Sequence, residues 1–478
     1  MGKYKSLILN TLLFAVNAVA TKLITFILVP LYTYYMSAAE YGVADMSLTV
    51  INLVTPLATF SIADAAVRFI VANRKRGDEY TAISMAVTLL SVVIVSVLSP
   101  LLNLDAFGGL GTYRALFILA YASSAFMNMC SEVARGMGEI KLIPVCAGIS
   151  SITTLLVALV LIGRLDMSIA GYFLSVSLGP IIACVLYLSV GGLGASALNG
   201  FRSLLRSSRS GFVELIRPML LYALPLIPNN LFWWLSSGIN RLFITGMMGI
   251  AASGMFAAAS KIPNLLNTAY TVFQQAWQLS AFQESGKEDI GKFFSSVFCM
   301  LQSGMTILCS LISFFSIGLA SVMLQGETFA AWPMISILLL SNLFNVFASF
   351  YGTVYSTTMH TSFIMKTTVF GAISCVVLTP LLIPVLGITG ACVASAIGQF
   401  LVFIMRTIDS RKYINFYIGW KYLLPTLMLL FVQAVVTSGQ FVGWRAISGL
   451  CSVMVIVIQL ANLAHSDVAR IVTNRLHR

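Results

Sequence analysis

The feature that most constrains this chain is a regular succession of apolar stretches, each long enough to be a membrane-spanning helix, separated by short polar connectors. A helix needs about 20 predominantly apolar residues to cross the hydrocarbon core of a bilayer. Of the 478 residues, 59% are hydrophobic and 9% are charged, whereas roughly a quarter are charged in an ordinary soluble domain. The sequence therefore predicts an all-α, polytopic membrane protein.

Fourteen such stretches are present, so we expect 14 transmembrane helices. They lie at approximately 6–34, 43–66, 82–104, 115–134, 142–163, 168–191, 219–247, 252–278, 294–318, 329–352, 363–384, 387–408, 422–440 and 443–464. The 14 stretches are called spans one to fourteen below.

The basic residues predict the orientation. With Lys3 and Lys5 inside, all other Lys and Arg fall on the cytoplasmic side, for example in a connector from Arg406 to Lys421, apart from three outside and three within spans. These exceptions are Arg114, Arg164 and Arg445, and Lys22, Arg241 and Lys261. Because positive flanking residues are retained inside, we expect both termini in the cytoplasm and a location in the bacterial inner membrane.

A long connector from Gly192 to Arg217, rich in Gly, Ser and Arg, divides the chain after span six. Met36 to Gly42 also resembles Met248 to Gly254, which is a weak internal repeat. Repeated halves are common in transporters. We expect a six-helix lobe at 1–210, a second at 211–410, and two extra helices with a basic tail at 411–478.

Metal, cofactor and nucleic-acid chemistry have no support in the sequence. The eight cysteines all lie in apolar stretches, form no CxxC pair and have no His partner at metal-ligand spacing, so they are interpreted as small buried hydrophobic residues. The net charge of +12 is spread over many short segments, unlike a basic nucleic-acid-binding element. We expect a transporter without cofactor or catalytic residues.

Four spans gather their polar residues on one helical face. At about 100° per residue, spans one, two, seven and eight each have such an arc, and span eight is the clearest case. Its polar residues are Ser260, Lys261, Asn264, Asn267, Thr268, Thr271, Gln274, Gln275 and Gln278. Polar faces either hold helices together or line an aqueous cavity; in the second interpretation the four faces meet around one cavity.

The charged residues within the spans favour the cavity interpretation. A Lys or Arg near the bilayer centre costs about 2.5–3.5 kcal/mol on insertion scales, so Lys22 and Lys261 are candidate ligands of an anionic substrate. Arg241 shares this role or extends to the outer interface. Asp45 and Asp64 are proton or sodium sites, counter-ions to the lysine, or ordinary helix-end residues.

Other residues belong to the predicted cytoplasmic mouth or to predicted hinges. Arg68 and Arg135, the latter near Glu132, are interpreted as solvated ion pairs or positive-inside anchors. Proline bends a helix and frees a carbonyl. The prolines within polar spans are therefore candidate hinges: Pro30, Pro56, Pro225, Pro228 and Pro263.

Three segments of the first 70 residues resemble a known family. Lys22-Leu-Ile-Thr-Phe-Ile-Leu-Val-Pro-Leu-Tyr32, Glu40-Tyr-Gly42 and Phe60 to Arg68 are similar to the opening of bacterial Wzx-type oligosaccharide flippases. These form the polysaccharide transporter branch of the MOP superfamily, which also contains MATE drug exporters and the lipid II flippase. The resemblance implies a V-shaped pair of lobes with facing walls from spans one, two, seven and eight.

The resemblance also implies a function and site roles. The substrate would be an undecaprenyl-diphosphate-linked oligosaccharide repeat unit, moved to the outer leaflet for O-antigen (lipopolysaccharide), capsule or exopolysaccharide assembly. Lys22, Lys261 and Arg241 would hold the diphosphate. Glycan-binding candidates are Asn17, Asn52, Asn230, Trp233, Asn264 and Gln275. Besides the substrate, the implied partners are membrane lipids, a polysaccharide polymerase and chain-length machinery.

Three alternatives remain. A MATE-type cation-coupled multidrug exporter would favour an acidic, aromatic cavity, whereas the ionised groups here are at least as basic as acidic. A membrane glycosyltransferase or polymerase would need a large extramembrane loop, and the predicted external loops are short. A lipid II flippase is the closest competitor.

Overall fold

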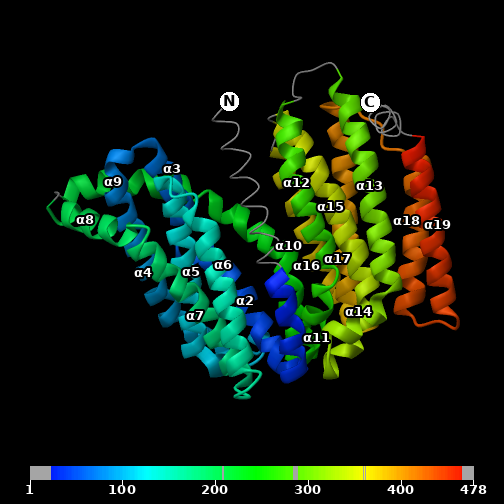
Figure 1. Cartoon of the computed structure of the whole chain (residues 1–478), viewed down its shortest axis with the longest axis horizontal. Coiled ribbons are helices and arrows are strands. Elements are labelled where there is room, and N and C mark those ends of the chain that lie inside the picture. Colours follow the sequence, from blue (N-terminus) through cyan, green and yellow to red (C-terminus); the bar gives the residue numbers. More distant parts are fainter. Residues whose placement is uncertain (1–22, 207–208, 284–288, 359, 361, 466–478) are drawn as a thin grey trace. The chain divides into compact units, whose positions relative to one another are not determined.

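The computed structural model describes residues 23–206, 209–283, 289–358, 360 and 362–465. Every regular element in these ranges is an α-helix or a short 3-10 helix (Figure 1). The predicted all-α membrane fold is therefore confirmed. The chain divides into two compact units, Met1–Gly254 and Met255–Arg478, and each is described by itself.

Unit 1 begins, in its described part, with a helix over Leu23–Tyr35. The following elements are α2 (Ala38–Ala58), α3 (Ile62–Ala72), η1 (Arg74–Arg76), α4 (Gly77–Leu98), η2 (Ser99–Asn103), η3 (Asp105–Phe107), η4 (Leu110–Tyr113), α5 (Arg114–Met137), α6 (Leu142–Leu161), α7 (Ser168–Ser189), α8 (Leu193–Arg206), α9 (Arg209–Ala223), α10 (Leu226–Met248) and the first residues of α11 (Ile250–Lys261). Helices α3, α4, α5 and α7 pack around a core that includes Ile70, Val133 and Tyr187. Their outward faces stay apolar, as lipid contact requires: Val97 of α4 is 71% exposed.

The connector after span six is folded rather than extended. It forms α8 and the first part of α9, and α8 lies along α4. Ser196 Oγ donates to Asp78 at 2.5 Å, and Ser203 Oγ donates to Glu79 at 2.7 Å. Because these hydroxyl-to-carboxylate bonds join α8 to the first turn of α4, the connector is a fixed part of unit 1.

Unit 2 contains the rest of α11 and a bundle of longer helices. These elements are α12 (Asn264–Gln283), α13 (Ile290–Phe314), α14 (Ser316–Met323), η5 (Gly326–Met334), α15 (Ile335–Thr357), α16 (Ser362–Leu386), α17 (Ile388–Asp409), η6 (Ser410–Lys412), α18 (Trp420–Ser438) and α19 (Trp444–Ala464). Helix α15 is central and packs on α12, α13, α17 and α18. Its Phe350 stacks on Trp277 of α12 at a ring-centroid distance of 5.0 Å and lies 5.1 Å from Phe298 of α13.

A buried hydrogen-bond network attaches the last two helices of unit 2. Gln433 of α18 is fully buried; its amide donates to the Ser310 carbonyl at 3.1 Å and to Ser448 Oγ at 3.0 Å. Ser310 Oγ of α13 in turn donates to the Gln433 side chain at 2.8 Å. Because an unsatisfied amide would be costly in an apolar interior, the network defines how α13, α18 and α19 pack.

Within the described residues, 11 helical segments are long and apolar enough to cross a membrane, or 12 if the bent pair α2 and α3 is one span. The predicted spans without a counterpart are one and eight. Span one lies mostly before Leu23, outside the described residues, and span eight is divided into α11 and α12. The chain is a multi-pass membrane protein; the number 14 and the lobe boundaries at 1–210, 211–410 and 411–478 stay predictions.

Helix breaks coincide with three of the prolines identified in the sequence. The chain bends by 50° between α2 and α3, shortly after Pro56. Pro225 lies at the break between α9 and α10, and Pro263 at the break between α11 and α12. Proline lacks the N–H that would continue the helical ladder, which favours a break at these positions, although Pro218 and Pro425 lie inside α9 and α18.

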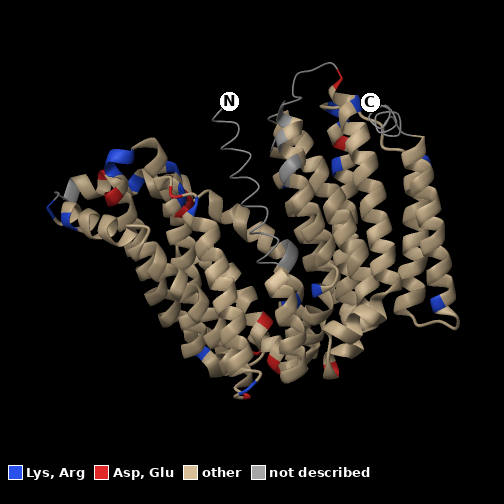
Figure 2. Ribbon diagram, viewed as in Figure 1, with Lys and Arg blue, Asp and Glu red and all other residues tan. Residues whose placement is uncertain are grey.

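Charged residues gather at helix ends in both units (Figure 2). Arg406, which falls at the end of span twelve and begins the expected cytoplasmic connector, lies in the last turn of α17 and is only 4% exposed. Its guanidinium donates to Thr367 Oγ1 and to the Ala348 carbonyl, both at 2.9 Å, and to Thr368 Oγ1 at 3.2 Å. Arg406 therefore joins α15, α16 and α17 by hydrogen bonds to neutral oxygens.

Candidate functional site

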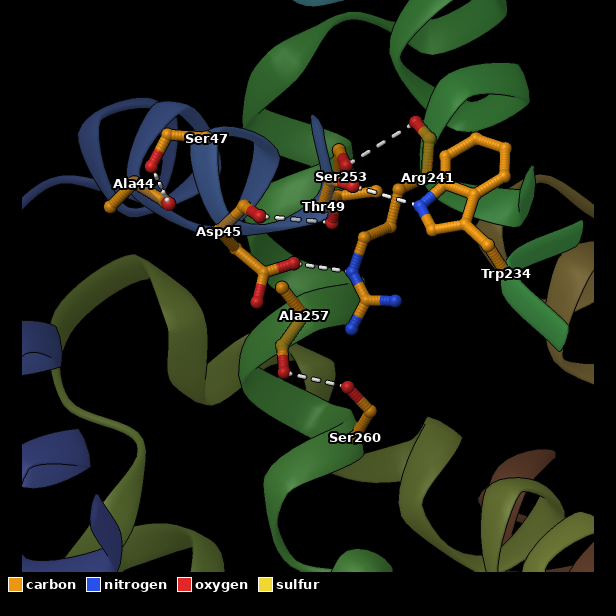
Figure 3. Close-up of polar contacts among 9 residues, drawn as sticks. All are labelled: Ala44, Asp45, Ser47, Thr49, Trp234, Arg241, Ser253, Ala257 and Ser260. Atoms are coloured by element: carbon orange, nitrogen blue, oxygen red, sulfur yellow. Dashed lines mark hydrogen bonds and ion pairs between the residues drawn. The ribbon is translucent and has the colours of Figure 1, made fainter. Parts of the chain in front are cut away.

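Two of the charged residues singled out in the sequence face each other in unit 1. Arg241 of α10 forms an ion pair and hydrogen bond, through Nε, with Oδ2 of Asp45 on α2 (Figure 3). The Asp45 side chain is 7% exposed and the Arg241 side chain 17%. The structure thus makes Asp45 the counter-ion of Arg241, whereas the counter-ion role expected for this carboxylate was toward the lysine.

The start of α2 places Asp45. Ser37 caps the helix, because its hydroxyl accepts the Glu40 N–H at 3.3 Å while the Glu40 carboxylate accepts the Ser37 N–H at 2.8 Å. This reciprocal arrangement is a capping box. Ser168 of α7 also donates to Glu40, at 2.6 Å. With its first turn fixed in this way, α2 presents Asp45 toward α10.

Further contacts pack α10 and α11 against α2 within unit 1. Trp234 is buried and donates its indole N–H to the Thr49 carbonyl at 2.8 Å (Figure 3). Gly254 meets the start of α2 so closely that a Cβ built there would lie 1.9 Å from the Ala38 carbonyl oxygen and 2.9 Å from the Gly42 nitrogen. The match between the two Gly-containing repeat segments therefore corresponds to a close contact between them.

The break between α2 and α3 has a strained backbone. Phe60 and Ser61 have φ of 52° and 50°, which is unusual for residues with side chains. Asn230 of α10 donates to Ser61 Oγ at 3.4 Å. Such conformations persist where surrounding contacts enforce them, and they are common at switch regions.

Arg68, one of the two residues expected at the cytoplasmic mouth, lies on α3 after this break. It is exposed, and so is Asp64, the second carboxylate considered for ion coupling, one turn earlier on the same helix. Arg135 pairs with Glu132 on α5, with 3.0 Å between Nη1 and Oε2. The Arg135 side chain is 52% exposed and that of Glu132 is 16% exposed, and the role of the pair at a cytoplasmic mouth stays a prediction.

In unit 2, four asparagines form a ladder between α12 and α15. Asn264 Oδ1 accepts the side-chain N–H of Asn267 at 3.4 Å and that of Asn342 at 3.5 Å. Asn345 Nδ2 donates to Asn267 Oδ1 at 3.4 Å. These contacts are longer than the usual 2.7–3.2 Å, so a ligand hydroxyl can replace them at low cost.

The ladder continues the polar face predicted for span eight. Lys261 ends α11 and is half-buried, and Asn264, the most exposed of the four asparagines, begins α12 after the break at Pro263. Thr271, two turns along α12, is also exposed. A cation at a helix break followed by amides and hydroxyls suits a ligand with an anionic group and several hydroxyls.

Two of the remaining candidates lie on helices of unit 1. Asn52 of α2 is exposed, and Trp233 of α10 is 51% exposed. Lys22 and Asn17 lie outside the described residues, as does the side chain of Gln275. The single cavity expected from spans one, two, seven and eight stays a prediction.

Sequence reasoning missed Asn342 and Asn345. Their spacing of three residues in the otherwise apolar span ten was the available signal, because i and i+3 lie on one helical face. In the part of the chain that the structure describes, no group of three or more His, Cys, Asp or Glu residues could hold a metal ion.

Comparison with known proteins adds the family. The model of a family described as polysaccharide biosynthesis protein matches residues 7–278, more than half of the chain. A comparison with curated proteins finds no match.

Solved structures of three transporters share the fold. The lipid II flippase MurJ, in an inward closed conformation, has a TM-score of 0.68 and 14% identity, covering 95% of this chain and 99% of that one. An inward-facing multidrug resistance MATE family transporter has a TM-score of 0.66 and 13% identity, covering 83% and 97%. A MOP superfamily transporter from Pyrococcus furiosus, described as having a binding pocket of reverse polarity, has a TM-score of 0.59 and 14% identity, covering 84% and 95%. The chain therefore belongs to the polysaccharide biosynthesis protein family and has the fold of MOP superfamily transporters.

Proposed function

We propose that this protein is a flippase that moves undecaprenyl-diphosphate-linked oligosaccharide repeat units from the cytoplasmic to the outer leaflet of the inner membrane. The observation that carries the proposal is the polar face of unit 2, where Lys261 is followed by the asparagine ladder, in a chain of the polysaccharide biosynthesis family. A diphosphate needs a cationic donor, and a glycan needs amides and hydroxyls.

In the proposed mechanism, Lys261 binds the diphosphate through charge-assisted hydrogen bonds, as does Lys22 in span one. Asn264 and its neighbours on α12 and α15 bind sugar hydroxyls, while the polyprenyl tail stays in lipid. An inside-negative potential of roughly 100 mV favours the outward movement of about two negative charges by about 4–5 kcal/mol. The potential can therefore drive export without ATP. Both termini lie in the cytoplasm in this proposal.

A lipid II flippase is the second candidate. The structural match to MurJ covers 95% of this chain, whereas the match to the MATE transporter covers 83%. A drug exporter is less well supported, since the acidic side chain of Asp45 is neutralised by Arg241.

Transport assays separate these candidates. The purified protein would be reconstituted in liposomes with a fluorescent undecaprenyl-diphosphate oligosaccharide, with labelled lipid II, or with a cationic dye. We expect potential-dependent translocation of the oligosaccharide. Translocation of lipid II alone would favour the second candidate, and dye transport alone would overturn the flippase assignment.

A further inference from the structure

A cavity of about 300 Å³ lies in unit 2, away from the asparagine ladder, where three helix ends meet. The first turns of α13 and α18 and the last residues of α19 border it. Its polar lining includes Lys292, Ser295, Ser296, Lys421, Asn462 and His465.

The ionisable side chains that line this cavity are basic, apart from the phenol of Tyr417 and one cysteine thiol. Lys292, Lys421 and His465 are basic, and no acidic residue lines the cavity in the described part of the chain. The N-terminal ends of α13 and α18 add the positive ends of two helix dipoles. Gly419, which also lines the cavity, caps α18 and has no side chain to bond its first turn.

Hydrogen bonds hold the lining in place. Ser295 Oγ accepts the Tyr417 N–H at 2.8 Å, which fixes the connector before α18 against α13. Asn462 is 5% exposed and donates to Ser303 Oγ at 3.3 Å. His465 Nδ1 lies 2.8 Å from the Ala461 carbonyl oxygen. Because a carbonyl only accepts, Nδ1 is the donor in this contact.

One carboxylate competes for this cationic lining. Asp289 accepts a hydrogen bond from Lys292 Nζ at 2.9 Å, and both side chains are about four-fifths exposed, at 79% and 80%. This bond holds the pKa of Asp289 below its ordinary value, so the carboxylate is ionised at neutral pH. An anionic ligand must therefore share Lys292 with Asp289.

An apolar stripe begins beside the cavity. Along the face of α18 that carries Lys421, the following residues are Leu424, Met428 and Phe431, which are 50%, 66% and 60% exposed. Their spacing of three and four residues keeps them on one side of the helix. A basic cavity at the end of such a stripe combines sites for a phosphate and for an acyl chain.

We propose that this cavity binds the phosphate headgroup of an anionic membrane phospholipid, whose acyl chains lie along the stripe of α18. Basic pockets between transmembrane helices are suited to such headgroups. The stripe favours a lipid over soluble phosphate, which has no apolar part. The proposal does not depend on the transported substrate.

Lipid binding can be measured with the full-length protein, delipidated in detergent. Native mass spectrometry and thermal unfolding would be recorded with phosphatidylglycerol, with phosphatidylcholine, and with sodium phosphate. We expect retention of phosphatidylglycerol and a higher Tm with this lipid alone. Lys421→Gln should weaken its retention roughly tenfold, which corresponds to about 1.4 kcal/mol, and Lys292→Gln should have a similar effect.

Two variants make the test specific. Arg445→Gln is the control. It also removes one positive charge, but beside Trp444 at the end of α19 far from the cavity, and should leave lipid retention unchanged. Asp289→Asn should strengthen retention, because it removes the competitor of the headgroup without altering the lining. Equal retention by wild type, Lys421→Gln and Lys292→Gln would overturn the site. An equal effect of sodium phosphate would overturn its assignment to a lipid.

Discussion

Arg241 of α10 and Asp45 of α2 form an ion pair inside unit 1, with only 17% and 7% of their side chains exposed. Each charge offsets the desolvation cost of the other, and neither could be left alone there cheaply. The pair joins two helices that are distant in sequence. Any role of Asp45 in ion coupling would require this pair to open.

Breaking the pair from one side should destabilise the protein. Asp45→Asn removes the negative charge that faces Arg241, and Arg241→Gln removes the matching positive charge. Each single variant should cost about 3–5 kcal/mol, as expected for a buried pair that loses one partner. The double variant should cost less than the sum of the two. Thermal unfolding in detergent measures all three, and additive losses would show that the pair contributes no coupling.

The close contact at Gly254 gives a second prediction. A Cβ at this position would overlap the Ala38 carbonyl, so Gly254→Ala should force α2 and α11 apart and cost about 1–3 kcal/mol. Gly246→Ala is the matched control, because no atom beyond its chain neighbours and the backbone of its own helix lies within 4 Å of its Cβ position. This change should stabilise α10 by about 0.5–1 kcal/mol. Opposite shifts in Tm are expected. Similar shifts in both variants would argue against the close approach.

Much of the fold could be predicted because a membrane imposes simple rules on sequence. Long apolar stretches mark the helices, and Pro56, Pro225 and Pro263 mark where they break. The structure of the connector after span six was harder to predict. Ser196 and Ser203 of α8 bond to acidic residues that lie more than 100 positions earlier in the chain. Short-range periodicity contains no information about such partners.

The candidate site could be predicted only in part. Helical periodicity found the polar face of Asn264 and identified Asp45 and Arg241 as unusual, but it could not pair them, because their helices are brought together by tertiary packing. The surroundings of Arg406 could not be predicted for the same reason. Hydroxyls and carbonyls from α15 and α16 accept its hydrogen bonds inside the bundle.

The asparagine ladder should determine glycan transport more than stability. Asn342→Ala and Asn345→Ala each remove hydrogen-bonding groups whose present contacts are 3.4–3.5 Å long. We expect a loss of less than about 1 kcal/mol in stability, since even a typical hydrogen bond contributes only about 0.5–1.5 kcal/mol, but a several-fold lower rate of oligosaccharide translocation. Asn199→Ala, at an exposed position on α8, is the control and should leave transport unchanged. Normal transport by both ladder variants would remove α15 from the glycan site.

Charge at Lys261 separates anion transport from drug export. If Lys261 binds a diphosphate, Lys261→Arg should keep most of the activity, although the two cations differ in shape. Lys261→Gln should lose a charge-assisted hydrogen bond worth about 1.5–3 kcal/mol, which is roughly a 10- to 150-fold loss of affinity. At Lys22, too, the Arg variant should keep more activity than the Gln variant.

A drug-cation exporter should show the opposite trend, because removing a positive charge would ease entry of a cation. Complementation of a polysaccharide-deficient strain and a dye-efflux assay, run on the same variants, measure both. Improved efflux of a cationic dye by the Gln variants, with normal polysaccharide, would contradict the flippase proposal.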